Sequence, residues 1–430
     1  MPKILRSEAL DSNVHYFVKW TLFSLLCGLV IGSVGALLRR AVDLVTANWN
    51  AHPAVILLAP VSILLTNLLV KLLHEEKNGG TNTVIDSISE GKHISRNTAP
   101  LLFFSTILSH TVGASVGKEG AALMIGGSLG EFFADLIRFD EREKRIAILC
   151  GMSACFSALF GTPLSAALFS IEMISIGSLY YSALVPCIFA SFFASELSRA
   201  IGNHADVMPV PLAPPFRFGT ACTTVLFGIY MAGVAVLFAV ILYNGSRRTA
   251  RLLPNPWIRG ITASVLLILL TALNYRFLAH GFQFNGGGFP LAKLAMEEQA
   301  PWYSFALKLL FTCVCVFGGY KGGEIVPTFC LGACAGAFFA QVLGLDVRLF
   351  TACGMTAMFC GMTNCPITSL LLSFELFGEA GMPYYAVAIA VSFTFSGYYG
   401  LYTSQRFSYS KTQNAYNGRK GPRGFWKDRR

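Results

Sequence analysis

Long apolar stretches follow one another along most of this chain and are separated by short polar turns. Four of them cover residues 17–38, 54–73, 225–243 and 261–278, with an occasional basic residue near one end. Each is long enough to cross a hydrocarbon layer of about 30 Å as an α-helix, which takes roughly 20 residues. The pattern leaves no stretch for a water-soluble domain and predicts an all-α integral membrane protein.

The chain also repeats itself at a distance of about 200 residues. Residues 150–156 read CGMSACF, and residues 353–359 read CGMTAMF. A second pair supports the same alignment, because residues 126–134 read GGSLGEFFA and residues 332–340 read GACAGAFFA. The chain is therefore predicted to contain two related halves.

The two halves are placed at about 20–200 and 215–405, within a single transmembrane domain of residues 1–430. Repeated halves of transporters are often inverted relative to each other, and the transport site then lies where they meet. After the second half we expect only a basic tail at 406–430. Lys and Arg beside apolar segments tend to stay cytoplasmic, which predicts that both termini face the cytoplasm.

Composition narrows the classes of function. The net charge is +10, but the basic residues are scattered through short loops and gathered in the tail, which fits membrane orientation better than a nucleic-acid partner. Most of the 12 cysteines lie inside apolar runs without a CxxC pair, as is typical of small buried side chains. No HExxH pattern is present, and we expect neither an enzyme nor a metal or cofactor.

Two glycine-interrupted segments, one in each half, begin at Gly117 and Gly322. A helix that starts inside a membrane leaves backbone N–H groups without acceptors, and its start carries about half a positive charge. Two such starts could meet and attract a halide without holding it as tightly as a fixed Lys or Arg would. We favour this interpretation for Gly117, Gly120, Gly322 and Gly323.

Glycines can instead serve only to let helices pack closely, as small residues at four-residue spacing commonly do in membranes. We favour this alternative for Gly126, Gly130, Gly332 and Gly336.

Glu119 is an acidic residue at the start of a strongly apolar run. Burying a carboxylate at membrane depth costs at least a few kcal/mol, so such a residue normally has a function. A carboxylate beside helix N-termini can occupy the place of an anion, and its protonation would vacate that place. Glu119 is therefore predicted to be both a plug and a proton carrier, with a structural salt bridge to Lys118 as the alternative.

Over nearly its whole length the sequence resembles the CLC family of chloride channels and chloride/proton antiporters. Residues 117–120, GKEG, resemble the family's GxEGP motif, whose glutamate is the external gate, although Ala121 replaces the proline. Residues 322–327, GGEIVP, resemble the GGxFxP motif, whose backbone amides bind the central anion, although Ile325 replaces the phenylalanine. Tyr402 matches the tyrosine whose hydroxyl contacts that anion.

The resemblance implies a fold of about 18 helices of unequal length, built from two inverted repeats whose broken helices meet at the anion site. It also implies a homodimer in the bacterial plasma membrane, with the apolar segments near 160–200 and 365–395 in contact between the subunits. Because the chain ends soon after Tyr402, we do not expect the cytoplasmic regulatory (CBS) domains that some relatives carry. The remaining motif, GSGIP, would lie in residues 78–83, NGGTNT, where Thr81 offers a hydroxyl. Alternatively, this loop only caps a helix through Thr81 or Asn82.

Two departures from the family pattern bear on mechanism. The antiporters keep a second glutamate one position beyond that of Glu172, and here that residue is Met173. Glu324 is an acid within the anion-binding motif, which resembles the fluoride/proton antiporter branch of the family, a branch that also lacks the second glutamate. Glu324 could titrate and couple protons to anions, or it could pair with Lys321. Against fluoride, that branch tends to carry methionine where this chain has Thr81.

We therefore predict transport of a halide, through a chloride channel or a chloride/proton antiporter gated by Glu119, with fluoride/proton antiport as the alternative. The expected partners are a halide, a proton, membrane lipid and a second copy of the chain. Because Glu172 and Glu375 occupy equivalent positions in the two halves, both are expected to be structural. The predicted gating and proton-carrying residues are Glu119 and Glu324, and the predicted anion-binding positions are Thr81, Gly117, Gly323, Glu324, Ile325, Val326 and Tyr402.

Overall fold

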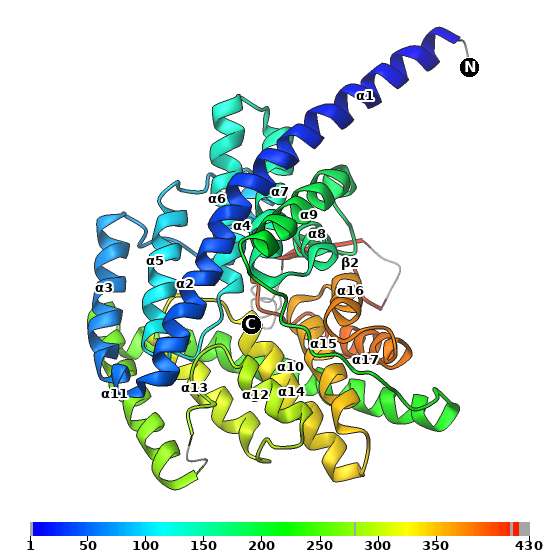
Figure 1. Ribbon diagram of the computed structural model, residues 1–430. Coiled ribbons are helices and arrows are strands. Elements are labelled where there is room, and N and C mark those ends of the chain that lie inside the picture. The colour runs from blue at the N-terminus through cyan, green and yellow to red at the C-terminus, as the bar shows by residue number, and fades with distance from the viewer. Residues whose placement is uncertain (1–2, 279–280, 413–415, 421–430) are drawn as a thin grey trace.

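The computed structural model describes residues 3–278, 281–412 and 416–420, and these residues are mostly helical (Figure 1). The helices of the first half are α1 (Lys3–Leu26), α2 (Gly32–Ala51), α3 (Ala59–Leu72), α4 (Thr81–Glu90), α5 (Thr98–Thr111), α6 (Glu119–Ile137), α7 (Glu141–Phe160), α8 (Pro163–Glu172) and α9 (Leu184–Ala200). The helices of the second half are α10 (Phe218–Leu252), α11 (Pro256–Leu273), α12 (Phe289–Met296), α13 (Ser304–Gly318), α14 (Ile325–Leu343), α15 (Val347–Thr363), α16 (Pro366–Phe377) and α17 (Met382–Phe395).

The helices have very unequal lengths, as predicted. Within the described residues, seven helical stretches are long and apolar enough to cross a bilayer, and among them α10 has 35 residues. Others are far too short to cross, such as α4 with 10 residues and α12 with 8. Short helices must begin or end inside the protein, where other protein groups have to satisfy their ends.

The two halves pack in the same way. Helix α7 lies against α6, α8 and α9, and helix α15 lies against α14, α16 and α17. In Figure 1, α4 to α9 occupy the upper part of the view, and most of α12 to α17 lie below them. The internal repeat in the sequence therefore corresponds to a repeated helical unit.

Glycines bring α6 against α7 and α14 against α15 at backbone distance. A Cβ added to Gly126 would lie 2.2 Å from the carbonyl oxygen of Gly151, and one added to Gly332 would lie 2.4 Å from that of Gly354. Gly130 and Gly336 are equally close to the partner helix, so only glycine fits at these positions. The packing role predicted for these four glycines is confirmed.

Replacing Gly332 by alanine should destabilise the protein, since the added methyl group meets backbone that cannot move away. We expect a loss of about 1–3 kcal/mol in the free energy of unfolding, as for other overpacked sites. The melting temperature of the purified protein in detergent measures this. Gly233→Ala in α10 is the matched control, because nothing lies within 4 Å of its added Cβ. Equal melting temperatures for the two variants would contradict the close-packing argument.

Helices α8 and α16 are the equivalent helices of the two halves, and each one caps the other. The carboxylate of Glu172, at the end of α8, accepts a hydrogen bond of 2.8 Å from the N–H of Thr368 at the start of α16. The carboxylate of Glu375, in the last turn of α16, accepts one of 2.9 Å from the N–H of Ser165 at the start of α8. The two helices therefore run antiparallel, which is the inverted relation predicted for the repeats, and both glutamates are structural, as expected.

The start of the predicted tail is bound to the helical body. Strand β2 (Arg406–Tyr409) pairs in parallel with β1 (Ser175–Ile176), which follows α8, and pairs antiparallel with β3 (Tyr416–Lys420). Lys411 donates hydrogen bonds to Asn364 Oδ1 at 2.5 Å and to the carbonyl of Phe393 at 2.9 Å. The rest of the predicted tail, residues 421–430, lies outside the described residues.

Candidate functional site

The two glycine-interrupted segments contact each other inside the protein, at Gly117 and Gly323. The N–H of Gly117 donates to the carbonyl of Gly323 at 2.7 Å, and the N–H of Gly323 donates to the carbonyl of Gly117 at 2.6 Å. A Cβ on Gly120 would lie only 2.9 Å from the Cα of Gly323. Since α6 begins at Glu119 and α14 at Ile325, both helices start beside this bridge. The predicted meeting of two helix N-termini is confirmed.

The bridge engages two amides that were predicted to bind the anion. The N–H groups of Gly117 and Gly323 both have carbonyl acceptors, so these residues set the distance between the two segments. The N–H groups that follow Gly323 at the start of α14 have no such carbonyl acceptors. In α14 the first intrahelical bond comes from Thr328 N–H, which leaves the amides of Ile325 and Val326 without an acceptor in the helix.

A third helix starts at the same place. Helix α4 begins at Thr81, after a loop that carries two glycines. The cap position is Gly80, and no side chain caps the helix, so the alternative role of Thr81 as an N-cap is not observed. Thr81 Oγ1 lies 3.8 Å from where a Cβ of Gly120 would be, which puts the starts of α4 and α6 side by side.

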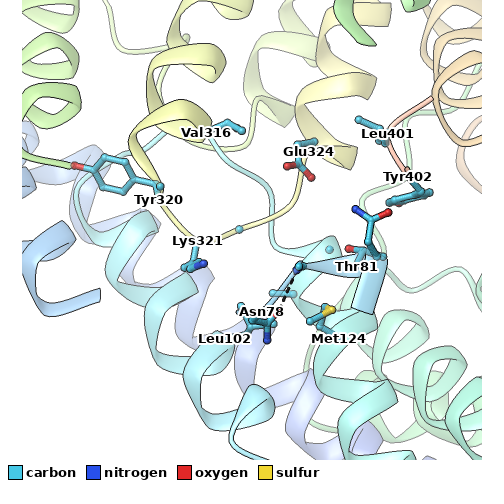
Figure 2. A pocket seen from close by; sticks show the side chains of 17 residues that line it. Asn78, Thr81, Leu102, Met124, Val316, Tyr320, Lys321, Glu324, Leu401 and Tyr402 are labelled. Atoms are coloured by element: carbon cyan, nitrogen blue, oxygen red, sulfur yellow. Dashed lines mark hydrogen bonds between the residues drawn. The ribbon is translucent and has the colours of Figure 1, made fainter. Parts of the chain in front are cut away.

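A cavity of about 220 Å³ lies among these three helix starts (Figure 2). The residues predicted from the sequence that line it are Thr81, Gly120, Gly322, Glu324 and Tyr402, whereas Gly117, Glu119, Gly323, Ile325 and Val326 do not. Lys321, named from the sequence only as a partner for Glu324, also lines it. Asn78 and Met124 are among the lining residues for which the sequence gave no role.

Tyr402 reaches the cavity on a segment that is tied to α4. The N–H of Ser404 donates to Asn82 Oδ1 at 2.9 Å, which joins residues more than 300 positions apart. The hydroxyl of Tyr402 is buried and has no hydrogen-bond partner among the described residues. Because buried polar atoms nearly always have a partner, this hydroxyl is available to a small ligand in the cavity.

Glu119 is completely buried, and neither of its carboxylate oxygens has a hydrogen-bond partner in the described part of the chain. The carboxylate folds back over the bridge, since a Cβ on Gly117 would lie 2.5 Å from Glu119 Oε2. Lys118 does not neutralise it and instead forms an ion pair of 2.9 Å with Asp43. The alternative prediction of a Glu119–Lys118 salt bridge is therefore wrong.

Glu324 occupies the N-cap position of α14, but its side chain does not cap the helix. Figure 2 shows its carboxylate directed into the cavity, on the same side as Tyr402. None of the ion pairs within the described residues joins Glu324 to Lys321, so the alternative pairing proposed from the sequence is not formed. The cavity thus holds one carboxylate and one amine that are not paired with each other.

Met173 stands where a second acid would be expected in a chloride/proton antiporter. Its side chain is fully buried, and its carbonyl accepts a hydrogen bond of 3.0 Å from Gln405 Nε2. Gln405 also donates to the carbonyl of Thr363 at 2.8 Å. Neither Met173 nor the amide of Gln405 can carry a proton at physiological pH, so this position offers no proton relay.

Comparison with known protein families agrees with this geometry. The model of the voltage gated chloride channel family matches residues 61–397. A chloride/fluoride channel protein of Pseudomonas syringae pv. tomato is 32% identical over 414 residues, which are 96% of this chain and 91% of the relative. The H(+)/Cl(-) exchange transporter ClcA of Yersinia pseudotuberculosis is 26% identical over 384 residues, 81% of this chain and 78% of the relative.

Solved structures are similar as well. The crystal structure of a CLC-type fluoride/proton antiporter has a TM-score of 0.84 and 26% identity, and the match covers 90% of this chain and 97% of the other. A slow cyanobacterial Cl-/H+ antiporter, 20% identical, has the same fold, with a TM-score of 0.77 and coverage of 88% and 94%. With these similarities and the repeated, inverted helices, the chain belongs to the voltage-gated chloride channel (CLC) family.

Proposed function

We propose that this protein transports a halide across the membrane, through the cavity and past Glu119, in exchange for protons. One observation carries the proposal: the buried carboxylate of Glu119 at the start of α6 and the buried hydroxyl of Tyr402 in the cavity both lack a hydrogen-bond partner among the described residues. An unpartnered buried polar group costs free energy and persists when a ligand uses it. Helix N-termini favour anions, so the ligand is expected to be a small anion.

The anion would be held by groups that attract it without a full charge. These are the amides of Ile325 and Val326 at the start of α14, and the hydroxyls of Thr81 and Tyr402. Each helix start supplies about half a positive charge. Binding by partial charges is weak enough for the anion to leave again, which transport requires.

Glu119 would control the path because its carboxylate competes with the halide for the same positive helix ends. When ionised, it occupies the place beside the bridge; when protonated, it loses its attraction to the helix ends and yields that place to the halide. Glu324 would add to the coupling, since its negative charge in the cavity opposes a halide until a proton neutralises it. Proton and halide binding at the two acids are thereby linked.

Removing the Tyr402 hydroxyl should weaken halide binding without unfolding the protein. A net contribution of about 1 kcal/mol for one hydrogen bond predicts about a fivefold rise in the halide Kd of Tyr402→Phe. Isothermal titration of the purified protein with sodium chloride and sodium fluoride measures it. Tyr385→Phe is the matched control, because Tyr385 also has a buried, unpartnered hydroxyl but does not line the cavity. Unchanged affinity in Tyr402→Phe would remove this tyrosine from the site.

Fluoride is the second candidate for the transported halide, in proton-coupled antiport. Two features favour fluoride over chloride. Glu324 lies in the cavity, and Met173 replaces the second glutamate of the chloride/proton antiporters. Both features resemble the fluoride/proton antiporter branch of the family. The structural similarity to a CLC-type fluoride/proton antiporter supports the same choice. Chloride remains the competing substrate, with Thr81 as its supporting residue.

Liposome flux separates these possibilities. Vesicles containing the purified protein would be loaded with equal concentrations of potassium fluoride or potassium chloride, with valinomycin to set the voltage. Ion-selective and pH electrodes in the bath would follow halide release and proton uptake together. Fluoride release with proton uptake supports the antiporter, whereas release of either halide without proton movement would show a channel and contradict the coupling proposed for Glu119 and Glu324.

We also propose a homodimer in a bacterial plasma membrane, with both termini on the cytoplasmic side. The apolar segments near 160–200 and 365–395 would form the contact between subunits. Exposed apolar side chains on these segments, including Phe192 and Phe374, support this choice. Mass photometry of the protein in nanodiscs tests the dimer, and a monomer at all concentrations would contradict it.

A further inference from the structure

The cavity contains a cationic group that the proposed site does not use. Lys321 lies between the end of α13 and the start of α14, and its side chain lines the cavity (Figure 2). No hydrogen bond and no ion pair to its amine occurs among the described residues. Lys321 is only partly covered by protein, and its amine is open to the cavity, where an anion could reach it.

Two other lysines in the described part of the chain, the fully buried Lys308 and the partly buried Lys411, have hydrogen-bond partners. Lys308 donates to three oxygens, those of Ser115 Oγ at 2.9 Å, the Phe284 carbonyl at 3.1 Å and the Gly286 carbonyl at 2.7 Å. Lys411, in the tail, donates to Asn364 and to the carbonyl of Phe393. Lys321 differs from both because it faces an open volume rather than protein oxygens.

Three charged groups act electrostatically on Lys321 without forming an ion pair with it. They are Glu324, Glu75 just after α3, and Arg259 on α11. Glu75 Oε2 already accepts hydrogen bonds from Asn78 Nδ2 at 2.7 Å and from Thr98 Oγ1 at 3.2 Å, whereas its Oε1 is buried without a hydrogen-bond partner among the described residues. Glu75 is therefore the protein group that Lys321 would otherwise neutralise, and the experiment below has to separate the two roles.

We propose that Lys321 is a second halide-binding position, at which the halide is captured in the cavity before it moves to the helix amides. An ammonium group is a compact point charge that suits a small, strongly hydrated anion. A cation in a low-dielectric cleft also raises the local concentration of anions and their rate of entry. Glu324 on the facing wall weakens this attraction, which keeps the halide from being held too tightly to move on.

This inference rests on the proposed halide transport and is tested on the same liposomes. Halide release is measured against halide concentration for the parent protein, Lys321→Met and Lys321→Arg. We expect Lys321→Met to raise the half-saturating halide concentration about tenfold, as for the loss of one attracting charge beside a cleft, with the maximal rate and the proton-to-halide ratio unchanged. Lys321→Arg keeps the charge and should stay close to the parent. Lys293→Met, which removes an exposed lysine on α12, is the control for general charge effects.

The outcomes separate the inference from the function on which it rests. If the parent protein releases no halide at all, the proposed function is wrong. If the parent saturates with halide and Lys321→Met saturates at the same concentration, only the role of Lys321 is wrong. The double variant Glu75→Gln/Lys321→Met tests the alternative that Lys321 only neutralises the negative charge of Glu75. Recovery of parental halide affinity in the double variant would overturn the inference, whereas continued weak affinity supports it. The Arg variant keeps the test valid if Lys321→Met fails to fold.

Discussion

Glu119→Gln is expected to abolish proton movement while halide transport continues. Glutamine has nearly the shape of a protonated glutamate, so the variant should stay in the state in which the carboxylate has yielded its place to the halide. The buried carboxylate has no protein partner to lose, so the fold should tolerate the change. In the liposome assay, proton uptake should fall to the level of empty vesicles, and halide release should become insensitive to pH.

A matched control for this variant lies on the same helix. Glu131 is also buried in α6, but its carboxylate accepts hydrogen bonds from the N–H of Ile94 at 2.9 Å and from the His93 ring at 2.6 Å. In Glu131→Gln the side-chain oxygen can still accept from the N–H of Ile94, and the side-chain amide can bond the other tautomer of His93. The variant should therefore leave the proton-to-halide ratio unchanged. Proton uptake that persists at the parental ratio in Glu119→Gln would show that protons take another path, and Glu119 would not be the gate.

Lys308→Met is expected to cause the largest loss of stability. Lys308 is fully buried on α13, and it joins the segment before Glu119, through Ser115, to the loop before α12, through Gly286. Methionine fills a similar volume but leaves the carbonyls of Phe284 and Gly286 without the Lys308 donor, whereas Ser115 Oγ keeps Thr312 Oγ1 as a partner at 3.0 Å. At about 1–3 kcal/mol for each unsatisfied buried group, the loss in unfolding free energy should reach several kcal/mol.

Thermal unfolding in detergent, followed by size-exclusion chromatography of the heated sample, measures this effect. Lys293→Met serves as the control here too, since that lysine is exposed on the neighbouring helix α12. Halide flux through any Lys308→Met protein that folds should also fall, because the segment that leads to Glu119 loses its anchor. A melting temperature equal to that of Lys293→Met would show that water or backbone movement satisfies these oxygens instead.

Much of the fold follows from local patterns in the chain. Apolar stretches of about 20 residues predict helices in a membrane wherever they occur, since no other structure satisfies the backbone there. The repeat predicted equivalent helices, and the matching pair Glu172 and Glu375 was correctly assigned a structural role. Glycines at four-residue spacing predicted close helix packing, which the contacts of Gly126 and Gly332 confirm.

From the residues alone, the candidate site was predicted only where a residue is unusual in its own segment, and Thr81 and Tyr402 came from the family resemblance. Glu119 and Glu324 could be found because a carboxylate next to an apolar run is costly and therefore noticeable. Their partners could not be assigned in the same way. The sequence offered Lys118 and Lys321 as alternative partners because they lie near the acids in the chain, whereas Lys118 pairs with Asp43, which is 75 positions away.

By itself, the sequence determined that this protein lies in a membrane, consists of two related halves and carries acids at the starts of broken helices. Only the tertiary structure decided which groups surround the cavity, since Thr81, Gly120, Glu324 and Tyr402 come from four distant segments. It also decided that Gly117 and Gly323 form hydrogen bonds with each other, and that Lys321 has no hydrogen-bond or ion-pair partner among the residues that the structure describes. The physical reason is that hydrophobic periodicity is a local property of the chain, whereas a cavity and its unpaired charges depend on how segments hundreds of residues apart pack together.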